Sequence, residues 1–483
     1  MSFTMKILRA GLMAGVAVFV SVSGAAAGAS SPADANARLQ SLESEISSLQ
    51  AEVQDLKRSQ SQQYADLRQQ SQGAGDVRLS LNGGKPVLKT ADGAFSFEPR
   101  LMVQYDTAYY AQGEMPAGID FSSGSNFRRA RFGADGTLFT DWAYEFIYDF
   151  GGSGVEGTSI TSAYIQYNGL APFHFRIGAY APPESFEDTT SPTDFLFLER
   201  AQPTDVARSI AGGDGRDAAT VFAYGDNYFA ALSYTGSVVG TGAQFDEQQA
   251  LVGRAAYRLV NTGDANLALG ADASYVFRLP DIAPGPNSPN GISLSERPEL
   301  NVDDNSIRLV STGTLLADKV WHWGAEAAGN WRSLYGQGGY YNIHVNRTGG
   351  LGDASFAGWY AQASWVLTGE ARTWNPARGA FSAPKPADPF TLGHAGTGAW
   401  EIAARYSVLD LNDNAGIALL PTPAGGVRGG EQKIWTAGIS WYPNTAIRFM
   451  LDYQHTDVNR LDPLGASLDA RLDAVSLRTQ VAF

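Results

Sequence analysis

The stretch DWAYEFIYDF, residues 141–150, decides the fold because its side chains alternate strictly along the chain. Large aromatic rings occupy every second position, and acids or smaller residues lie between them. Successive side chains of a β-strand point to opposite faces, so a period of two produces one apolar face and one mixed face. The rings are those of Trp142, Tyr144, Phe146, Tyr148 and Phe150, and they alternate with Asp141, Ala143, Glu145, Ile147 and Asp149.

The same alternation recurs from about Phe95 to the last residue, with clear examples at 321–332, 400–407 and 475–483. A soluble β-sandwich also alternates, but its core favours Val, Ile and Leu throughout. Here Trp, Tyr and Phe gather near the strand ends around Ala, Gly and Leu, as in the interfacial girdles of a membrane barrel. In lipid, strands satisfy all their backbone hydrogen bonds only in a closed barrel. The sequence therefore predicts an all-β protein, a transmembrane antiparallel β-barrel of the outer membrane.

The length of the repeating region predicts the size of this barrel. Residues 95–483, at roughly 25 residues for a strand and its connection, indicate about 16 strands, with about 14 or 18 as alternatives, and such a barrel has an aqueous lumen. Short turns at 140–141 and 442–444 are expected in the periplasm, and long Gly/Pro/Asp/Asn-rich connections outside the cell. The long connections are 181–217, 280–304, 371–398 and 412–430. We expect 181–217 to fold inward as a constriction loop; an ordinary surface loop is the alternative.

The region before the barrel has two further patterns. Residues 1–29 are typical of a cleaved signal peptide, since two basic residues precede an apolar run at 10–22 and small residues follow. Residues 30–75 contain a linker and a heptad pattern that predicts a periplasmic coiled coil; a single helix packed on another domain would have a wider apolar face. A connector, 76–94, leads to the barrel. The coiled-coil core consists of Leu39, Leu42, Ile46, Leu49, Val53 and Leu56.

Composition excludes several function classes. The chain has no cysteine and a net charge of −14, which argue against thiolate metal sites and against non-specific binding of nucleic acid. The five histidines have no local metal-binding spacing, and no nucleophile elbow or phosphate-binding loop is present. We therefore predict no enzyme, no cofactor and no metal. The Asp/Asn-rich runs at 301–305 and 410–414 are interpreted as solvated turns, with calcium binding as the alternative.

Several motifs, taken in chain order, carry a resemblance to a known family. They are FRRARFG (127–133), DWAYEF (141–146), YDF (148–150), AYIQY (163–167), FRIG (175–178), PESFE (183–187), FLER (197–200), WVLTGEAR (365–372) and GAF (379–381). Their order resembles the phosphate- and polyphosphate-selective porin family, porins O and P, of Gram-negative outer membranes. The resemblance covers nearly the whole barrel.

The resemblance implies a trimeric porin of 16 strands, often with an N-terminal periplasmic coiled coil. It also implies an anion path in which a ladder of arginines down the lumen meets lysines on the inward loop. The match at 127–131 carries the ladder to Arg129 and to Arg128. The lysines have no counterpart, because the stretch FEDTTSPTD at 186–194 contains none. This departure puts phosphate specificity in doubt.

Alternation alone also assigns charges to the lumen. The polar side of the strands carries an excess of arginine over acid, whereas the connection 181–217 is acidic. A ring of fixed charge selects ions of the opposite sign, although each arginine can equally well pair with a neighbouring acid. The inward set is Arg129, Arg131, Arg176, Arg254, Arg258, Arg308, Arg405, Arg448 and Arg478, with Glu145, Asp149, Glu326, Glu401 and Asp452. The constriction-loop set is Glu187, Asp188, Asp194, Glu199 and Arg200.

The function that we predict is passive diffusion of small solutes through the outer membrane, with anions such as phosphate or polyphosphate favoured. The first alternative is a weakly selective or cation-preferring general porin. The second is a tether to the cell wall, in which the coiled coil makes the contact and the barrel is an anchor. Expected partners are two further copies of the chain, outer-membrane lipid and lipopolysaccharide, the cell wall through the coiled coil, and small anions, but no nucleic acid.

Overall fold

The computed structural model describes residues 32–72, 77–82, 85–152, 159–239, 246–285, 287–303, 305, 307–393 and 395–483. The expected signal peptide, 1–29, lies outside the described residues. Two compact units are present, Met1–Ala74 and Gly75–Phe483. Among the described residues, no helix is both long and apolar enough to cross a membrane.

The first unit contains one helix, α1, Pro32–Gln72. Its 41 residues extend for about 62 Å at 1.5 Å per residue. The predicted seam residues Leu42, Ile46, Leu49 and Val53 are 50–55% exposed, and Leu56 is 65% exposed; the side chain of Leu39 is not among those described. In the single chain these apolar side chains of α1 are therefore not covered by another described segment. The coiled coil stays a prediction.

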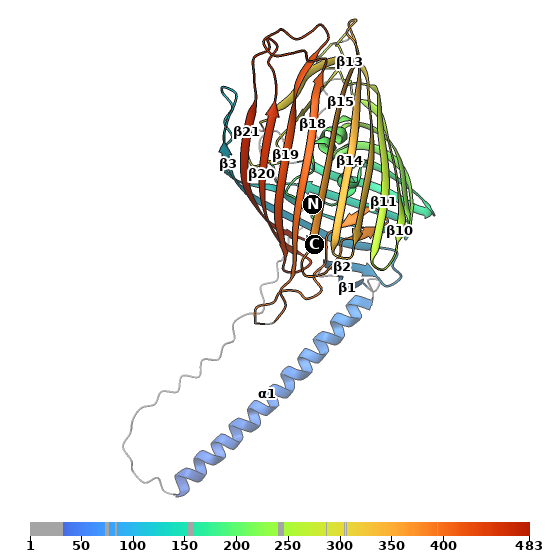
Figure 1. Cartoon of the computed structure of the whole chain (residues 1–483). Coiled ribbons are helices and arrows are strands. Elements are labelled where there is room, and N and C mark those ends of the chain that lie inside the picture. Colours follow the sequence, from blue (N-terminus) through green and yellow to red (C-terminus); the bar gives the residue numbers. More distant parts are fainter. Residues whose placement is uncertain are drawn as a thin grey trace. The chain divides into compact units, whose positions relative to one another are not determined.

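The second unit is a closed antiparallel barrel of sixteen strands, so the predicted fold and strand number are confirmed (Figure 1). Each strand pairs with the next barrel strand along the chain, and β21 closes the barrel against β3 from Ala482↔Met102 to Leu472↔Gln112. The strands are β3 (Ser96–Gln112), β4 (Gly124–Leu138), β5 (Trp142–Asp149), β6 (Ser159–Leu170), β7 (Phe173–Tyr180), β8 (Arg216–Gly225), β9 (Tyr228–Val238), β10 (Gln249–Asn261), β11 (Ala265–Arg278), β13 (Val310–Trp331), β14 (Leu334–Arg347), β15 (Ala354–Val366), β18 (Ala399–Asp413), β19 (Val427–Tyr442), β20 (Ile447–Asn459) and β21 (Ala470–Ala482).

The predicted alternation appears in the exposure of the strand side chains. On β5, Trp142 and Phe146 are 43% and 50% exposed on the outer face. On β13, Trp323 and Trp331 face outward, whereas His322, the residue before Trp323, is buried on the inner face. The apolar face therefore lies on the outside of the barrel, where a soluble protein would place polar residues.

The remaining strands are not among the sixteen that form the barrel wall. The hairpin of β1 (Val77–Asn82) and β2 (Lys85–Thr90) bonds to the start of β3, so the predicted connector 76–94 contains strands that its sequence did not indicate. Strand β12 (Gly291–Glu296) pairs with β13. Strands β16 (Thr373–Asn375) and β17 (Ala380–Ser382) form a small hairpin.

The connections define two ends of the barrel. The long-connection end carries 113–123, 150–158, 181–215, 239–248, 279–309, 348–353, 414–426 and 460–469. The short-turn end carries 139–141, 171–172, 226–227, 262–264, 332–333, 443–446 and one long exception, 367–398. The prediction that grouped 371–398 with the long extracellular connections is therefore wrong. That segment follows β15, and since strands alternate in direction it must lie at the end where β4 and β5 are joined.

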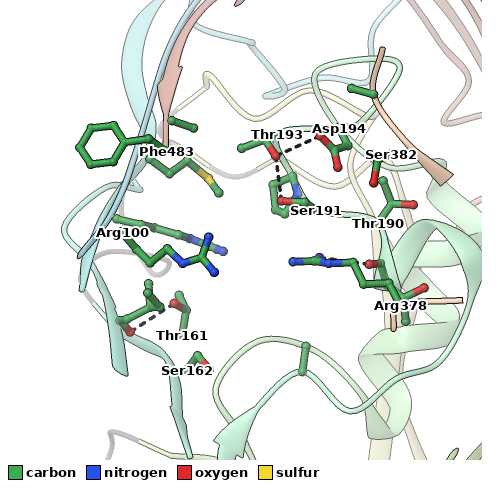
Figure 2. A pocket seen from close by; sticks show the side chains of 18 of the residues that line it. Arg100, Thr161, Ser162, Thr190, Ser191, Thr193, Asp194, Arg378, Ser382 and Phe483 are labelled. Carbon is green, nitrogen blue, oxygen red and sulfur yellow. Dashed lines mark hydrogen bonds between the residues drawn. The ribbon is translucent and has the colours of Figure 1, made fainter. Parts of the chain in front are cut away.

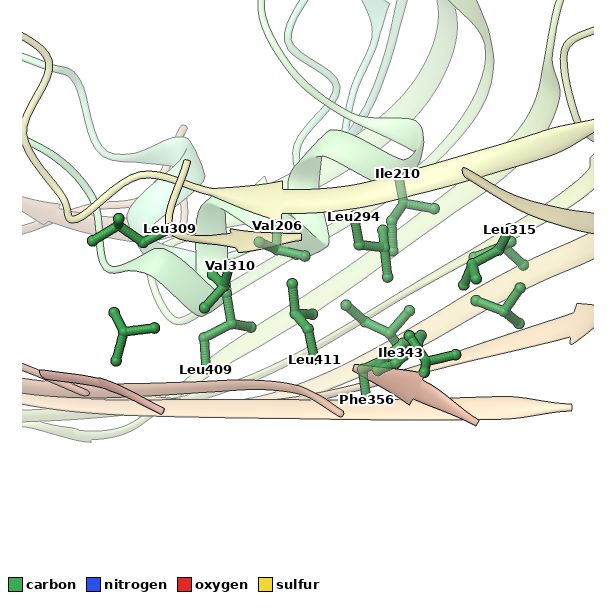
Figure 3. Close-up of a cluster of buried hydrophobic side chains, with 14 of the residues drawn as sticks. Val206, Ile210, Leu294, Leu309, Val310, Leu315, Ile343, Phe356, Leu409 and Leu411 are labelled. Atoms are coloured by element: carbon green, nitrogen blue, oxygen red, sulfur yellow. The ribbon is translucent and has the colours of Figure 1, made fainter. Parts of the chain in front are cut away.

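The connection 181–215 lies inside the barrel, where it forms α2 (Phe186–Thr189) and α3 (Gln202–Ala211). Helix α3 packs against β11, β12, β14, β15 and β18. Its apolar side chains Val206 and Ile210 meet Leu294 of β12 and join wall residues in one buried apolar cluster (Figure 3). This packing fills part of the lumen with a small core and fixes the connection in place.

Candidate functional site

Three of the predicted lumen arginines hold the backbone of the inward connection. Arg448 of β20 donates to the carbonyl of Phe195 at 2.6 Å and to that of Thr193 at 3.2 Å. Arg478 of β21 donates to the carbonyl of Leu198 at 2.6 Å. Arg405 of β18 donates to the carbonyl of Glu199 at 3.0 Å. These arginines are at most 2% exposed, so they anchor the connection to the wall more than they line an open path.

Glu199 lies at the centre of a second group of wall arginines. Its carboxylate accepts from Arg128 at 2.7 Å, from Arg129 at 3.3 Å and from Arg478 at 3.2 Å. Burial alone would raise the pKa of Glu199. The positive charges of Arg128, Arg129 and Arg478 lower it by more than burial raises it, so the pKa lies well below its usual value. The loop acid is thus ionised and neutralised by the wall.

A β-bulge explains how two consecutive arginines reach one carboxylate. The register between β3 and β4 runs from Gln104↔Arg129 to Tyr105↔Phe127 and leaves Arg128 without an opposite residue. An extra residue in one strand turns its side chain toward the same face as its neighbour. Arg128 therefore joins Arg129 in the lumen, where simple alternation would have placed it outside.

The other predicted arginines have varied partners. Arg131 pairs with Asp149 at 2.7 Å and with Asp214 of the inward connection at 2.6 Å. Arg254 donates to the carbonyls of Arg378 and Gly379 at 2.8 and 2.7 Å.

Arg258 contacts Asn227 and Asn266 near the short-turn end. Arg308, which alternation assigned to a strand, instead precedes β13 and donates to the carbonyl of Ser295 at 3.0 Å, because the wall strand begins only at Val310.

The predicted loop residues also differ in their surroundings. Glu187 accepts from the amide of Ala201 at 2.9 Å, and burial raises its pKa. Asp188 accepts from Arg208. Arg200 stacks over the Phe195 ring at 4.6 Å. Asp194 faces a cavity, with the hydroxyl of Thr193 at 3.3 Å.

Two cavities remain around the inward connection. The larger, of about 670 Å³, is lined by residues of the short-turn end, such as 377–378 and 444–447. The smaller, of about 540 Å³, is lined by residues of the long-connection end, such as 293–301. Both are lined by Arg131, Thr161, Arg200 and Asp214. These four residues therefore lie between the two cavities.

The larger cavity is cationic. Arg100, Arg131, Arg176, Arg200, Arg378, Lys385 and Arg448 line it with Glu145, Asp188, Asp194 and Asp214, a formal excess of three positive charges. In the smaller cavity, Arg128, Arg129, Arg131, Arg200, Arg208, Arg297 and Arg308 face Asp149, Glu199, Asp205, Asp214, Glu296 and Glu299, an excess of one. The positive excess thus lies mainly toward the short-turn end.

Within the larger cavity, four cations have no carboxylate within 4.0 Å in the part of the chain that the structure describes: Arg176, Arg378, Lys385 and Arg448. Of these, Arg448 is the one that binds the backbone of the inward connection. Arg176 instead donates to Gln166 and lies over the ring of Tyr164 at 4.2 Å. Figure 2 shows the guanidinium groups of Arg100 and Arg378 pointing toward one another across the cavity, beside the hydroxyls of Thr190, Ser191 and Thr193. Cations and hydroxyls on facing walls are the groups that bind oxyanions.

Sequence reasoning missed Arg100, Arg378 and Lys385. Arg100 lies at the start of β3, and the other two lie in connection 367–398, which had been assigned to the wrong end of the barrel. Counting strand directions along the chain is the signal that could have placed this connection correctly. Two cations of the larger cavity thus come from this connection, whereas the stretch 186–194 contains none.

Comparison with known proteins agrees with this architecture. The model of the family described as phosphate-selective porin O and P matches residues 97–483. An uncharacterized protein of Caulobacter vibrioides is 28% identical over 83% of this chain and 76% of its own length. Porin O of Pseudomonas aeruginosa is 24% identical over 80% of this chain and 88% of its own length.

Solved structures show a more distant likeness. The anion-selective porin from Comamonas acidovorans has 13% identity over 80% of this chain and 100% of that chain, with a TM-score of 0.47. The trimer form of OmpT from Vibrio cholerae has 10% identity over 81% and 100%, with a TM-score of 0.46. On the match over 97–483, together with the sixteen-stranded barrel, this chain belongs to the phosphate-selective porin O and P family and is an outer-membrane porin, a family of channels.

Proposed function

We propose that this porin prefers anions and that the larger cavity is where the preference arises. The observation that carries the proposal is the excess of three positive charges around this cavity, where Arg176, Arg378 and Lys385 have no acidic partner within 4.0 Å among the described residues. Fixed charges of one sign in a narrow pore raise the concentration of ions of the other sign. The acidic connection does not cancel this effect, because Glu199 is already neutralised by three wall arginines.

Phosphate and short polyphosphates are the anions that suit this cavity best. A guanidinium group offers two parallel donors to a phosphate, and an ammonium group adds a point charge. The hydroxyl of Ser191, which accepts from Thr193, adds a donor at the same cavity. In this proposal Arg378 and Lys385 take the place of the lysines that the stretch 186–194 lacks.

The rest of the proposal concerns assembly and orientation. After removal of residues 1–29, the short-turn end faces the periplasm, together with the coiled coil of 30–75 and the hairpin of 76–94. Barrel 95–483 forms a homotrimer through its lipid-facing walls, since apolar walls of several hundred Å² contribute more than about four imperfect heptads. The outer face also contacts lipid and lipopolysaccharide.

Planar-bilayer recording of the purified full-length protein tests the selectivity. Under a KCl gradient we expect a zero-current potential of the anion-selective sign. Phosphate added to KCl should lower the chloride current by occupying the cavity, whereas sulfate at equal ionic strength serves as the comparison anion. A potassium-selective sign would instead indicate that Asp194 and Asp188 control the pore, and the anion proposal would be wrong. A silent bilayer would favour the tether.

A further inference from the structure

Three buried side chains from different parts of the chain converge where the inward connection leaves the wall. Glu184 belongs to the connection, Asp272 to β11 and His322 to β13. The Nε2 atom of His322 lies 3.1 Å from Oε1 of Glu184 and 3.0 Å from Oδ1 of Asp272. The three side chains are at most 1% exposed, and their ligand atoms lie within 4.8 Å of one another.

The hydrogen bonds around the cluster leave its acceptors facing one another. Nδ1 of His322 lies 2.5 Å from the Ser274 hydroxyl, which can accept the Nδ1 proton and leave the Nε2 lone pair directed at both carboxylates. Neither oxygen of Glu184, nor Oδ2 of Asp272, has a hydrogen-bond partner among the described residues. Buried carboxylates without donors are costly, so a positive charge at their meeting point, on a bound ion or on a protonated His322, stabilises the cluster.

We propose that Glu184, Asp272 and His322 bind a divalent transition-metal ion such as Zn²⁺. Imidazole nitrogen and carboxylate oxygen are both zinc ligands, and two carboxylates balance the charge of the ion. Tetrahedral zinc with bonds of about 2.0 Å separates neighbouring ligand atoms by about 3.3 Å. The two distances from Nε2, 3.0 and 3.1 Å, are close to this value.

Two glycines make room for the carboxylates. A Cβ atom at Gly212 would lie 2.2 Å from Oε2 of Glu184, and one at Gly324 would lie 2.6 Å from Oδ2 of Asp272. A side chain at either position would therefore displace a proposed ligand.

The ion would join the inward connection to two wall strands. Two residues after Glu184, the amide of Phe186 donates to Glu326 of β13 at 2.7 Å. The start of the connection is thus held at two inward positions of β13, His322 and Glu326, and the ion adds β11 to the same contact. The proposed role is structural: the ion fixes the start of the connection that separates the two cavities.

Metal content of the full-length protein tests the site. The protein is folded with Zn²⁺ in excess, freed of loose metal by gel filtration, and analysed by inductively coupled plasma mass spectrometry. We expect about one zinc per chain in the wild type and at least about tenfold less in Glu184→Gln and in His322→Gln. Glu184→Gln keeps the size of the side chain and lies outside the wall strands.

His455→Gln is the matched control. His455 also lies beside two carboxylates, but its Nδ1 faces Asp473 at 2.8 Å while its Nε2 faces Asp457 at 3.0 Å. Opposite nitrogens cannot direct both acids to one ion, so this variant should keep its zinc.

Wild-type protein that folds with less than about a tenth of an equivalent of zinc, or variants that keep the metal, would overturn the proposal, because His322 would then simply be protonated between the acids. If neither cluster variant folds, a zinc-edge anomalous difference map of wild-type crystals decides: a peak between Glu184 and His322 supports the site, and its absence there rejects it.

Discussion

Removing the two cations of connection 367–398 should weaken the anion preference without disturbing the barrel. Arg378 and Lys385 are exposed to the larger cavity, and their replacement by alanine lowers its formal charge from plus three to plus one. A unit charge about 5 Å from a permeating ion contributes about 0.8 kcal/mol in water. Screening with a decay length of about 8 Å leaves about 0.4 kcal/mol for each charge.

That energy changes the local anion concentration about twofold and the cation concentration by the inverse factor, so the permeability ratio falls about fourfold for each charge. The double variant Arg378→Ala/Lys385→Ala should therefore lose anion preference roughly tenfold or more. The assay is the zero-current potential of reconstituted channels under a KCl gradient.

The double variant Arg332→Ala/Lys433→Ala is the matched control. Both of its cations lie outside the two cavities and pair with acids, Arg332 with Asp264 and Lys433 with Glu431. It should retain the wild-type potential. An unchanged potential in Arg378→Ala/Lys385→Ala, with normal conductance, would show that the larger cavity does not set selectivity.

Three further predictions concern stability, pH and assembly. Arg478→Met leaves Asp106 buried without its arginine and removes one of the three arginines of Glu199, so it should cost about 3–5 kcal/mol, seen as a lower temperature of barrel unfolding on heated gels. Arg471→Met, which removes an exposed pair, should cost less than about 1 kcal/mol. Equal shifts would contradict this. Because the pKa of Glu199 is lowered on folding, its pairs contribute fully above the unfolded carboxyl value of about 4.3 and are lost only as the pH falls through the lower folded value. Conductance should therefore stay constant between about pH 7 and 5. A fall in this range would mean that Glu199 takes up its proton at a higher pH than its arginine pairs allow, and would contradict the prediction. Deleting residues 33–71 should leave trimers on a native gel; monomers alone would make the coiled coil the main oligomeriser.

The barrel could be predicted from the sequence because its signal is local. In one strand such as Trp142–Asp149, the alternation of apolar and polar side chains already indicates which face contacts lipid. Its repetition along the chain predicts a closed barrel and the number of strands. The inward direction of Arg405, Arg448 and Arg478 followed from the same parity. The hydrogen-bond partners of these arginines could not be predicted from this parity, because the carbonyls that they bind lie about 200 residues or more away in the chain.

The candidate site was less predictable for three physical reasons. A β-bulge directs Arg128 into the lumen, and the residues around Arg128 in the sequence do not indicate where the strand register shifts. Connection 367–398 has the composition of a surface loop, and only the direction of β15 shows which end it belongs to. The ligands of the proposed zinc site come from three separate elements, so no spacing motif joins Glu184, Asp272 and His322.

The uneven charge of the two cavities makes the pore electrically polar along its axis. An anion entering at the short-turn end meets an excess of three positive charges at once, whereas an anion from the other end first crosses a zone with an excess of one. Under voltage, the entry that meets more favourable charge fills more readily, so the current depends on the direction of the field. Channels inserted with one orientation should rectify, and replacing Arg378 and Lys385 should straighten the current–voltage curve.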